Sequence, residues 1–135
     1  MYKHILIPLA LDHEMTAPQK IAFARRLLDE DGKITLLTVL EEIPGFVSEF
    51  VSVKAPNNLT DKIRGKLREA AGGDDGVDCI VAHGKAGVQI ARYAADNGVD
   101  LIVVGSHRPG AQDYFLGSTA ARVVRRAECS VHVMR

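Results

Sequence analysis

The sequence is poor in cysteine, with only Cys79 and Cys129 among its 135 residues. Two cysteines are too few for a disulfide scaffold, and they lack the CxxC spacing of zinc and redox motifs. Each lies beside an expected strand, so we interpret both as small, packed thiols rather than reactive ones. Few cysteines and no visible signal peptide are typical of a protein from a reducing compartment, and we expect a cytoplasmic location.

The chain also lacks an excess of charge of either sign, because 17 basic and 17 acidic residues cancel. Without a basic excess, the composition gives no support for a nucleic-acid or membrane-surface partner. No apolar run approaches the roughly 20 residues that a membrane-spanning helix needs. A neutral balance weakens the repulsion between copies of the chain, which favours self-association.

Several motifs that carry chemistry are missing. There is no GxxxxGK[ST], which excludes a P-loop ATPase, and no GxGxxG follows the first strand-like run, so a dinucleotide-binding fold is not supported. The histidines show no metal-ligand spacing such as HExxH, so we expect no metal site formed by the protein. His107 lies in a loop without a positioned nucleophile, which is weak evidence for catalysis, and we assign no catalytic residue.

Strand-like and helical patterns alternate along the chain. The first helical pattern has apolar side chains at Ala17, Ile21, Ala24 and Leu28, and we expect Gly32 to end it in a left-handed conformation. The alternation predicts one α/β domain over residues 1–135, with an open parallel sheet and helices on both faces. Residues 41–56 fit neither pattern. The five strand-like runs are residues 5–9, 34–40, 77–82, 101–104 and 130–134.

The stretch from Leu101 to Thr119 is the strongest candidate for a binding site. A buried strand leads into a loop and then into a helix whose first backbone amides have no intrahelical partner and attract anions. Gly105 lets a ligand approach the backbone, Arg108 could pair with a phosphate, and Ser118 offers a hydroxyl. The residues alone leave a second interpretation open, in which Ser118 only caps the helix and Gly105 only turns the chain.

The carboxyl-terminal third carries a family resemblance. Ser106-His107-Arg108-Pro109, Tyr114 to Ala121 and Ala127-Glu128-Cys129-Ser130-Val131 resemble the universal stress protein family, and the likeness extends over the whole chain. The resemblance implies a twisted five-stranded parallel sheet in the order 3-2-1-4-5, similar to the adenine-nucleotide alpha-hydrolases. It also implies a homodimer formed through the last strands and, in one branch of the family, a bound ATP or AMP.

Two positions depart from the pattern of that nucleotide-binding branch. The pattern is Gly-x-x-Gly, nine residues, then Gly-Ser/Thr, and here Gly105, Gly117 and Ser118 take three of its places. Arg108 stands at the second glycine place, and only eight residues separate it from Gly117. The family usually has an acidic residue two positions after the proline of the first strand, where this chain has Ala10.

The sequence therefore predicts a dimeric stress-response module that binds ATP or AMP, with Mg²⁺ as a possible companion of ATP. Two alternatives stay open: a nucleotide-free protein that acts through protein interactions, and at most a slow nucleotide hydrolase. The predicted contacts follow from the loop and from the resemblance together. Adenine would pack near Pro8, Leu9, Ala10 and Val39, and the phosphates would meet Gly105, Ser106, Arg108, Gly117, Ser118 and Thr119.

Overall fold

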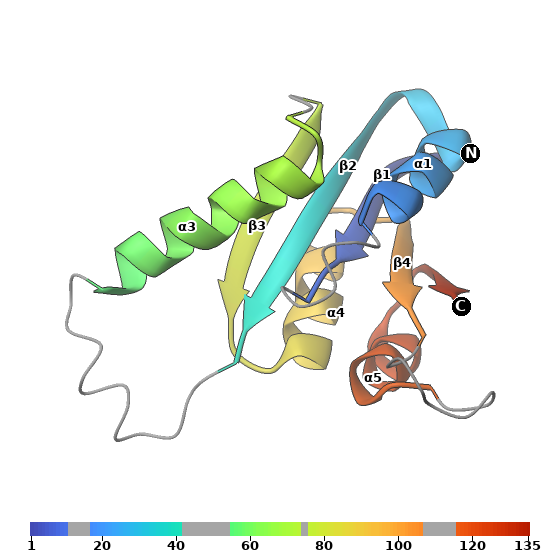
Figure 1. Cartoon of the computed structure of the whole chain (residues 1–135). Coiled ribbons are helices and arrows are strands. Elements are labelled where there is room, and N and C mark those ends of the chain that lie inside the picture. The colour runs from blue at the N-terminus through green and yellow to red at the C-terminus, as the bar shows by residue number, and fades with distance from the viewer. Residues whose placement is uncertain (11–16, 42–54, 74–75, 107–115) are drawn as a thin grey trace.

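The computed structural model describes residues 1–10, 17–41, 55–73, 76–106 and 116–135, with the side chains of residues 55–59 left out. Strands and helices alternate along these residues, as the sequence predicts (Figure 1). The elements in order are β1 (Tyr2–Pro8), α1 (Ala17–Leu27), β2 (Leu28–Leu40), α3 (Ala55–Ala70), β3 (Val77–His83), α4 (Ala86–Asp96), β4 (Leu101–Gly105), α5 (Ser118–Arg126) and β5 (Ser130–Met134).

The strands form one parallel sheet in the order β3-β2-β1-β4-β5, which confirms the predicted order. β1 occupies the centre, where Ile5 pairs with Ile34 of β2 on one side and with Leu101 of β4 on the other. A central parallel strand is buried on both faces, and residues 4–7 are all buried. The carboxyl ends of β1, β2 and β4 consequently meet at one edge of the sheet.

Helices cover both faces of the sheet, and successive strand residues point to opposite cores. Ile5 and Ile7 pack with α1 and α3 on one face, whereas Leu6 packs with α4 and α5 on the other. The same alternation divides β4, whose Leu101 and Val103 belong to the first core. The chain therefore changes faces between β1, which leads into α1, and β4, which leads into α5.

The boundary between α1 and β2 differs from the prediction. β2 begins at Leu28, directly after α1, and pairs there with Tyr2 of β1. Gly32 has no positive φ, so its expected role as a left-handed helix end is wrong. Space explains this glycine instead, because a Cβ at Gly32 would lie 2.5 Å from Cδ1 of Leu28.

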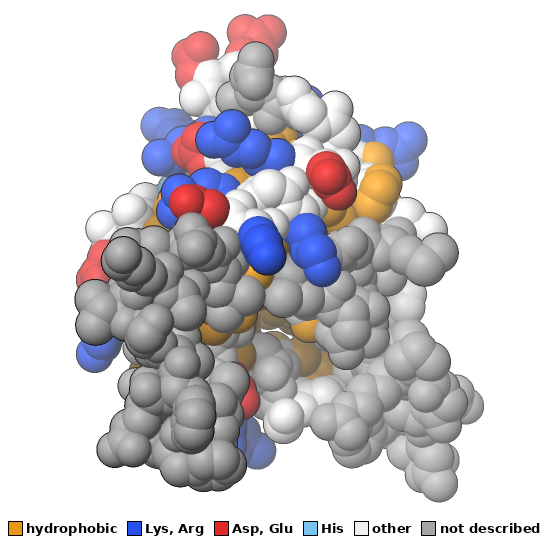
Figure 2. Space-filling model, turned by 60° about the vertical axis from the view of Figure 1, so that its left-hand side comes forward, with side chains coloured by type: hydrophobic (Ala, Val, Ile, Leu, Met, Phe, Trp, Pro, Cys, Tyr) orange, Lys and Arg blue, Asp and Glu red, His pale blue; other side chains and the backbone are white. Residues whose placement is uncertain are grey.

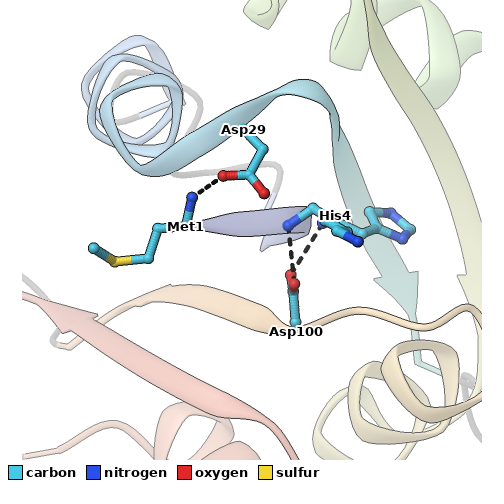
Figure 3. A network of polar contacts seen from close by, with 5 residues as sticks. Met1, His4, Asp29 and Asp100 are labelled. Atoms are coloured by element: carbon cyan, nitrogen blue, oxygen red, sulfur yellow. Dashed lines mark hydrogen bonds and ion pairs between the residues drawn. The ribbon is translucent and has the colours of Figure 1, made fainter.

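At the amino ends of the strands, polar contacts hold the first residues of the chain in place (Figure 3). The carboxylate of Asp100 accepts hydrogen bonds from the backbone amides of Lys3 at 2.9 Å and His4 at 3.0 Å. The amino group of Met1 forms an ion pair with Asp29 at the start of β2. These contacts tie β1 to the residues that precede β4 and to the extended start of β2.

His4 is buried among these contacts. Its Nδ1 lies 3.0 Å from the carbonyl oxygen of Asn97, and its Nε2 lies 2.8 Å from the hydroxyl of Thr35. Burial lowers the pKa of His4 below its ordinary value of 6.5, although the hydrogen bond to Asn97 opposes this. The neutral imidazole is therefore the form that the folded chain favours.

The two cysteines are half-buried and unpaired. Burial raises the pKa of both thiols, Cys79 in β3 and Cys129 before β5, which disfavours the reactive thiolate. This agrees with the interpretation of both as packed thiols. Within the described ranges, no helix combines the length and the hydropathy that crossing a membrane requires.

Candidate functional site

A pocket of about 550 Å³ lies at the carboxyl ends of β1, β2 and β4. This volume is within the range of sites that hold small ligands, roughly 300–1,000 Å³. Figure 2 shows that the lower half of the molecule is hollowed and that hydrophobic side chains are visible inside. Arg108 lies outside the described residues. The other predicted contacts all line the pocket: Pro8, Leu9, Ala10, Val39, Gly105, Ser106, Gly117, Ser118 and Thr119.

One wall of the pocket follows β1 and β2 and is mainly apolar. Pro8 ends β1, and the next residue, Leu9, continues the sheet because its amide donates to the carbonyl of Leu37 at 2.8 Å. The carbonyl of Leu9 accepts a hydrogen bond of 2.9 Å from the buried hydroxyl of Thr38. Both polar groups of the Leu9 backbone are thus engaged, which fixes an apolar surface formed with Val39 and Pro8.

The opposite wall begins where β4 ends. Ser106 is buried, its amide donates to the carbonyl of Met134 at 2.9 Å, and its carbonyl accepts from the amide of Gly117 at 2.9 Å. The bond to Met134 joins the end of β4 to β5, and the bond from Gly117 joins it to the start of α5. They also engage the amides of Ser106 and Gly117, so neither amide is available to a ligand in this arrangement.

The backbone amides that a ligand could use lie in the first turn of α5, since those of Ser106 and Gly117 are already engaged. Gly117 is the residue that caps this helix, without a side-chain hydrogen bond, and its carbonyl accepts from Ala121 at 2.9 Å. The interpretation of Ser118 as a helix cap is therefore wrong. The amides of Ser118, Thr119 and Ala120 make no hydrogen bond to any other described residue. All three residues line the pocket, and helix amides without intrahelical partners favour anions.

The described part of the chain does not require a glycine at position 117. Its φ is −54°, and a Cβ there would lie 3.6 Å from the carbonyl oxygen of Ser106, which is ordinary contact. Neither backbone strain nor crowding within the described residues explains the residue. A glycine at a pocket wall lets a ligand reach the backbone, and this is the explanation that the geometry favours.

Lys20 is a buried, charged pocket residue that sequence reasoning missed. It lies on α1, it lines the pocket, and only 7% of it is exposed. A Cβ at Gly105 would lie 3.1 Å from its Nζ, so the ammonium group lies against the end of β4. Its spacing could have revealed it, because Lys20 is three residues after Ala17 and four before Ala24, both on the buried face of the helix.

The charged side chains among the described lining residues of the pocket are all basic. Lys20 and Arg135 are the charged side chains among its described lining residues, and these residues include no aspartate or glutamate. Ala10, exposed at the end of β1, supplies no carboxylate. Across the described residues, no group of three or more His, Cys, Asp or Glu side chains could hold a metal ion. The described lining therefore suits an anionic ligand with an apolar part.

A family model described as "Universal stress protein family" matches residues 1–135. The chain belongs to the universal stress protein family. It is 29% identical to universal stress protein A homolog 2 of Coxiella burnetii, with 99% of this chain and 95% of that protein covered. This confirms the family that the sequence resembles.

Solved structures share the fold of this chain. The hypothetical protein MJ0577 is 26% identical, with a TM-score of 0.79 over 99% of this chain and 96% of that chain. A universal stress protein solved in complex with cAMP is 20% identical, with a TM-score of 0.68 over 99% of this chain and 97% of that chain. At this second level of identity the likeness concerns the fold.

Proposed function

We propose that this universal stress protein binds an adenine nucleotide, ATP or AMP, in the pocket at the carboxyl ends of β1 and β4, and that it acts as a binding module in the stress response. The observation that carries the proposal is the meeting of one apolar wall with the first-turn amides of Ser118, Thr119 and Ala120, which bond to no other described residue. An aromatic base with an anionic tail is the kind of ligand that such a pair of surfaces accommodates.

The strand order indicates how the nucleotide would be oriented in the pocket. Adenine packs near Pro8, Leu9, Ala10 and Val39, which lie over β1 and β2. The phosphates lie over β4 and the start of α5, near the five predicted contacts that line that side, with Arg108 as a charged partner. Gly105 and Gly117 leave room for the phosphates, Ser106 contributes its side chain, and Ser118 and Thr119 contribute amides and hydroxyls. Mg²⁺ would accompany ATP through the phosphates.

The comparisons support the ligand class. A universal stress protein of the same fold was solved in complex with cAMP, which contains both an adenine and a phosphate. The missing carboxylate at Ala10 favours a second candidate, a nucleotide-free protein that works through protein interactions. We favour nucleotide binding because the described lining of the pocket contains no acidic side chain that would repel phosphates.

Co-purified nucleotide separates the two candidates. The purified protein is denatured, and the supernatant is examined by anion-exchange chromatography and mass spectrometry. We expect about one ATP or AMP per chain, or binding of added AMP by calorimetry if the site is emptied during purification. If nucleotide neither co-purifies nor binds when added, the interaction role replaces this proposal. Loss of ATP in proportion to protein concentration would instead indicate a slow hydrolase.

We also propose that the protein is a cytoplasmic homodimer. β5 lies at an edge of the sheet, and Val124 of the adjoining α5 is 46% exposed. An edge strand and an exposed apolar side chain on a neighbouring helix are features that a second copy would cover. Light scattering during size-exclusion chromatography should give the mass of two chains. The mass of a single chain at micromolar concentration would contradict the dimer.

A further inference from the structure

Lys20 is an unusual residue to find inside a folded chain. Only 7% of it is exposed, and it projects from the face of α1 that also carries the buried Ala17, Ile21 and Ala24. A buried ammonium group loses its hydration, and buried lysines are therefore normally paired with an opposite charge. No ion pair or hydrogen bond joins the ammonium group of Lys20 to another described residue. The fold thus places this charge in the interior without a described partner.

The position of the ammonium group indicates where a partner would lie. Nζ is 3.1 Å from the place that a Cβ on Gly105 would occupy, so any side chain at position 105 would press against it. Gly105 ends β4 and lines the same pocket as the first turn of α5. The cation from α1 and the unpaired amides from α5 therefore reach one cavity from opposite faces of the sheet.

These observations carry a specific assignment, which rests on the proposed nucleotide binding. We propose that Lys20 is a phosphate-binding residue of this site, and that its charge makes the site select phosphorylated adenine ligands over adenosine. Backbone amides and hydroxyls alone supply partial charges, whereas an ammonium group supplies a full positive charge in a place shielded from water. The phosphate in turn supplies the opposite charge that the buried ammonium group lacks.

The protonation equilibrium of Lys20 agrees with this assignment. Burial lowers the pKa of Lys20 from its ordinary value of 10.5, because removal from water disfavours the charged form. A bound phosphate would oppose that effect and raise the pKa again. Adenosine, which has no charge to offer, would leave the pKa where burial sets it.

Lysine-to-methionine variants test the assignment by calorimetry with AMP and with adenosine. Lys20→Met keeps most of the side-chain length and removes the charge, while Lys66→Met makes the same change at an exposed position of α3. Removing one partner of a buried charge pair typically weakens binding on the order of 30-fold or more. We expect that loss for AMP with Lys20→Met alone. Adenosine affinity should stay within about twofold in both variants, since surface charges contribute little.

The outcomes separate this inference from the proposed function. If the wild-type protein binds neither ligand, nucleotide binding itself is wrong and the assignment of Lys20 falls with it. If the wild type binds AMP and Lys20→Met binds it equally well, the site stands and Lys20 has no part in it. An equal loss for AMP and adenosine would show a structural role, which also overturns the assignment.

A second measurement on the wild-type protein covers the case in which Lys20→Met does not fold. The Cε resonance of Lys20, in protein labelled with ¹³C-lysine, is followed during a pH titration. We expect the midpoint to move to higher pH when AMP is bound and to stay in place with adenosine. A midpoint that AMP leaves unchanged would overturn the proposal. The exposed Lys66 serves as the internal control.

Discussion

The contact between α4 and α5 gives a sharp test of the fold around the site. Gly87 is buried in the first turn of α4, and a Cβ added there would lie 2.5 Å from Cβ of Arg122 on α5. Carbon atoms in contact stay about 3.5–4.0 Å apart, so Gly87→Ala forces the two helices to separate by roughly 1 Å. The close approach of α5 to α4 therefore depends on the absence of a side chain at this position.

The expected change in stability is the difference of two opposing effects. Overpacking at a buried contact costs about 1–3 kcal/mol, whereas alanine is favoured over glycine inside a helix by about 0.8–1.0 kcal/mol. The difference is about 0–2 kcal/mol, so we expect Gly87→Ala to lower the free energy of unfolding by up to about 2 kcal/mol. Gly65 in α3 is the matched control, because a Cβ there would have no atom within 4 Å. Gly65→Ala should raise the free energy of unfolding by about 0.5–1 kcal/mol.

Urea unfolding followed by circular dichroism measures both variants against the wild type. The midpoints should move in opposite directions at unchanged slope, because neither substitution alters the area exposed on unfolding. Stabilisation by both substitutions would refute the reasoning, since it would mean that α4 and α5 do not touch at Gly87. Because α5 begins at the pocket, Gly87→Ala should also weaken AMP binding, and Gly65→Ala should leave it unchanged.

Three further predictions concern the binding loop, the buried histidine and the core. Ser118→Ala should weaken AMP binding by about 1–2 kcal/mol in calorimetry, and unchanged affinity would exclude a hydroxyl contact. Because burial lowers the pKa of His4, its stabilising effect is complete above pH 6.5 and is lost as the pH falls below that value. Urea unfolding at pH 8 and pH 5.5 should show this loss, which should be smaller in His4→Gln. Leu67→Ala, at a side chain 2% exposed, should cost about 2–5 kcal/mol of unfolding free energy, against at most about 0.5 kcal/mol for Lys66→Ala at the exposed neighbouring position.

Most of the fold could be predicted because the strong sequence signals act locally. Apolar runs and helical spacing define each element, and glycines mark several ends, such as Gly72 after α3 and Gly98 after α4, both with positive φ. The boundary at Leu28 could not be predicted in this way, because Leu28 continues the apolar spacing of α1. Pairing with Tyr2, which is distant in the sequence, decides that Leu28 belongs to β2.

The residues of the candidate site also differ in whether a local sequence signal reveals them. Gly105, Gly117 and Ser118 could be found from the sequence because a glycine and a hydroxyl at a strand end or helix start carry a local meaning. The spacing of Lys20 places it on the apolar face of α1, but its position in the pocket could not be predicted from the sequence. Its burial depends on where β4 ends relative to α1, and only the folded chain brings these two elements together.

The strand order explains both where the pocket lies and why Lys20 reaches it. β1 leads into α1 on one face of the sheet, while its neighbour β4 leads into α5 on the opposite face, so the two connections diverge and leave an open crevice between them. Among the described residues, the end of β4 lies near both Lys20 of α1 and Gly117 at the start of α5. A cation on the buried face of α1, three residues after Ala17, therefore lines the same pocket as the first turn of α5. A lysine one turn later, near Ala24, would instead be buried in the core between α1, β1 and β2, away from the pocket lining.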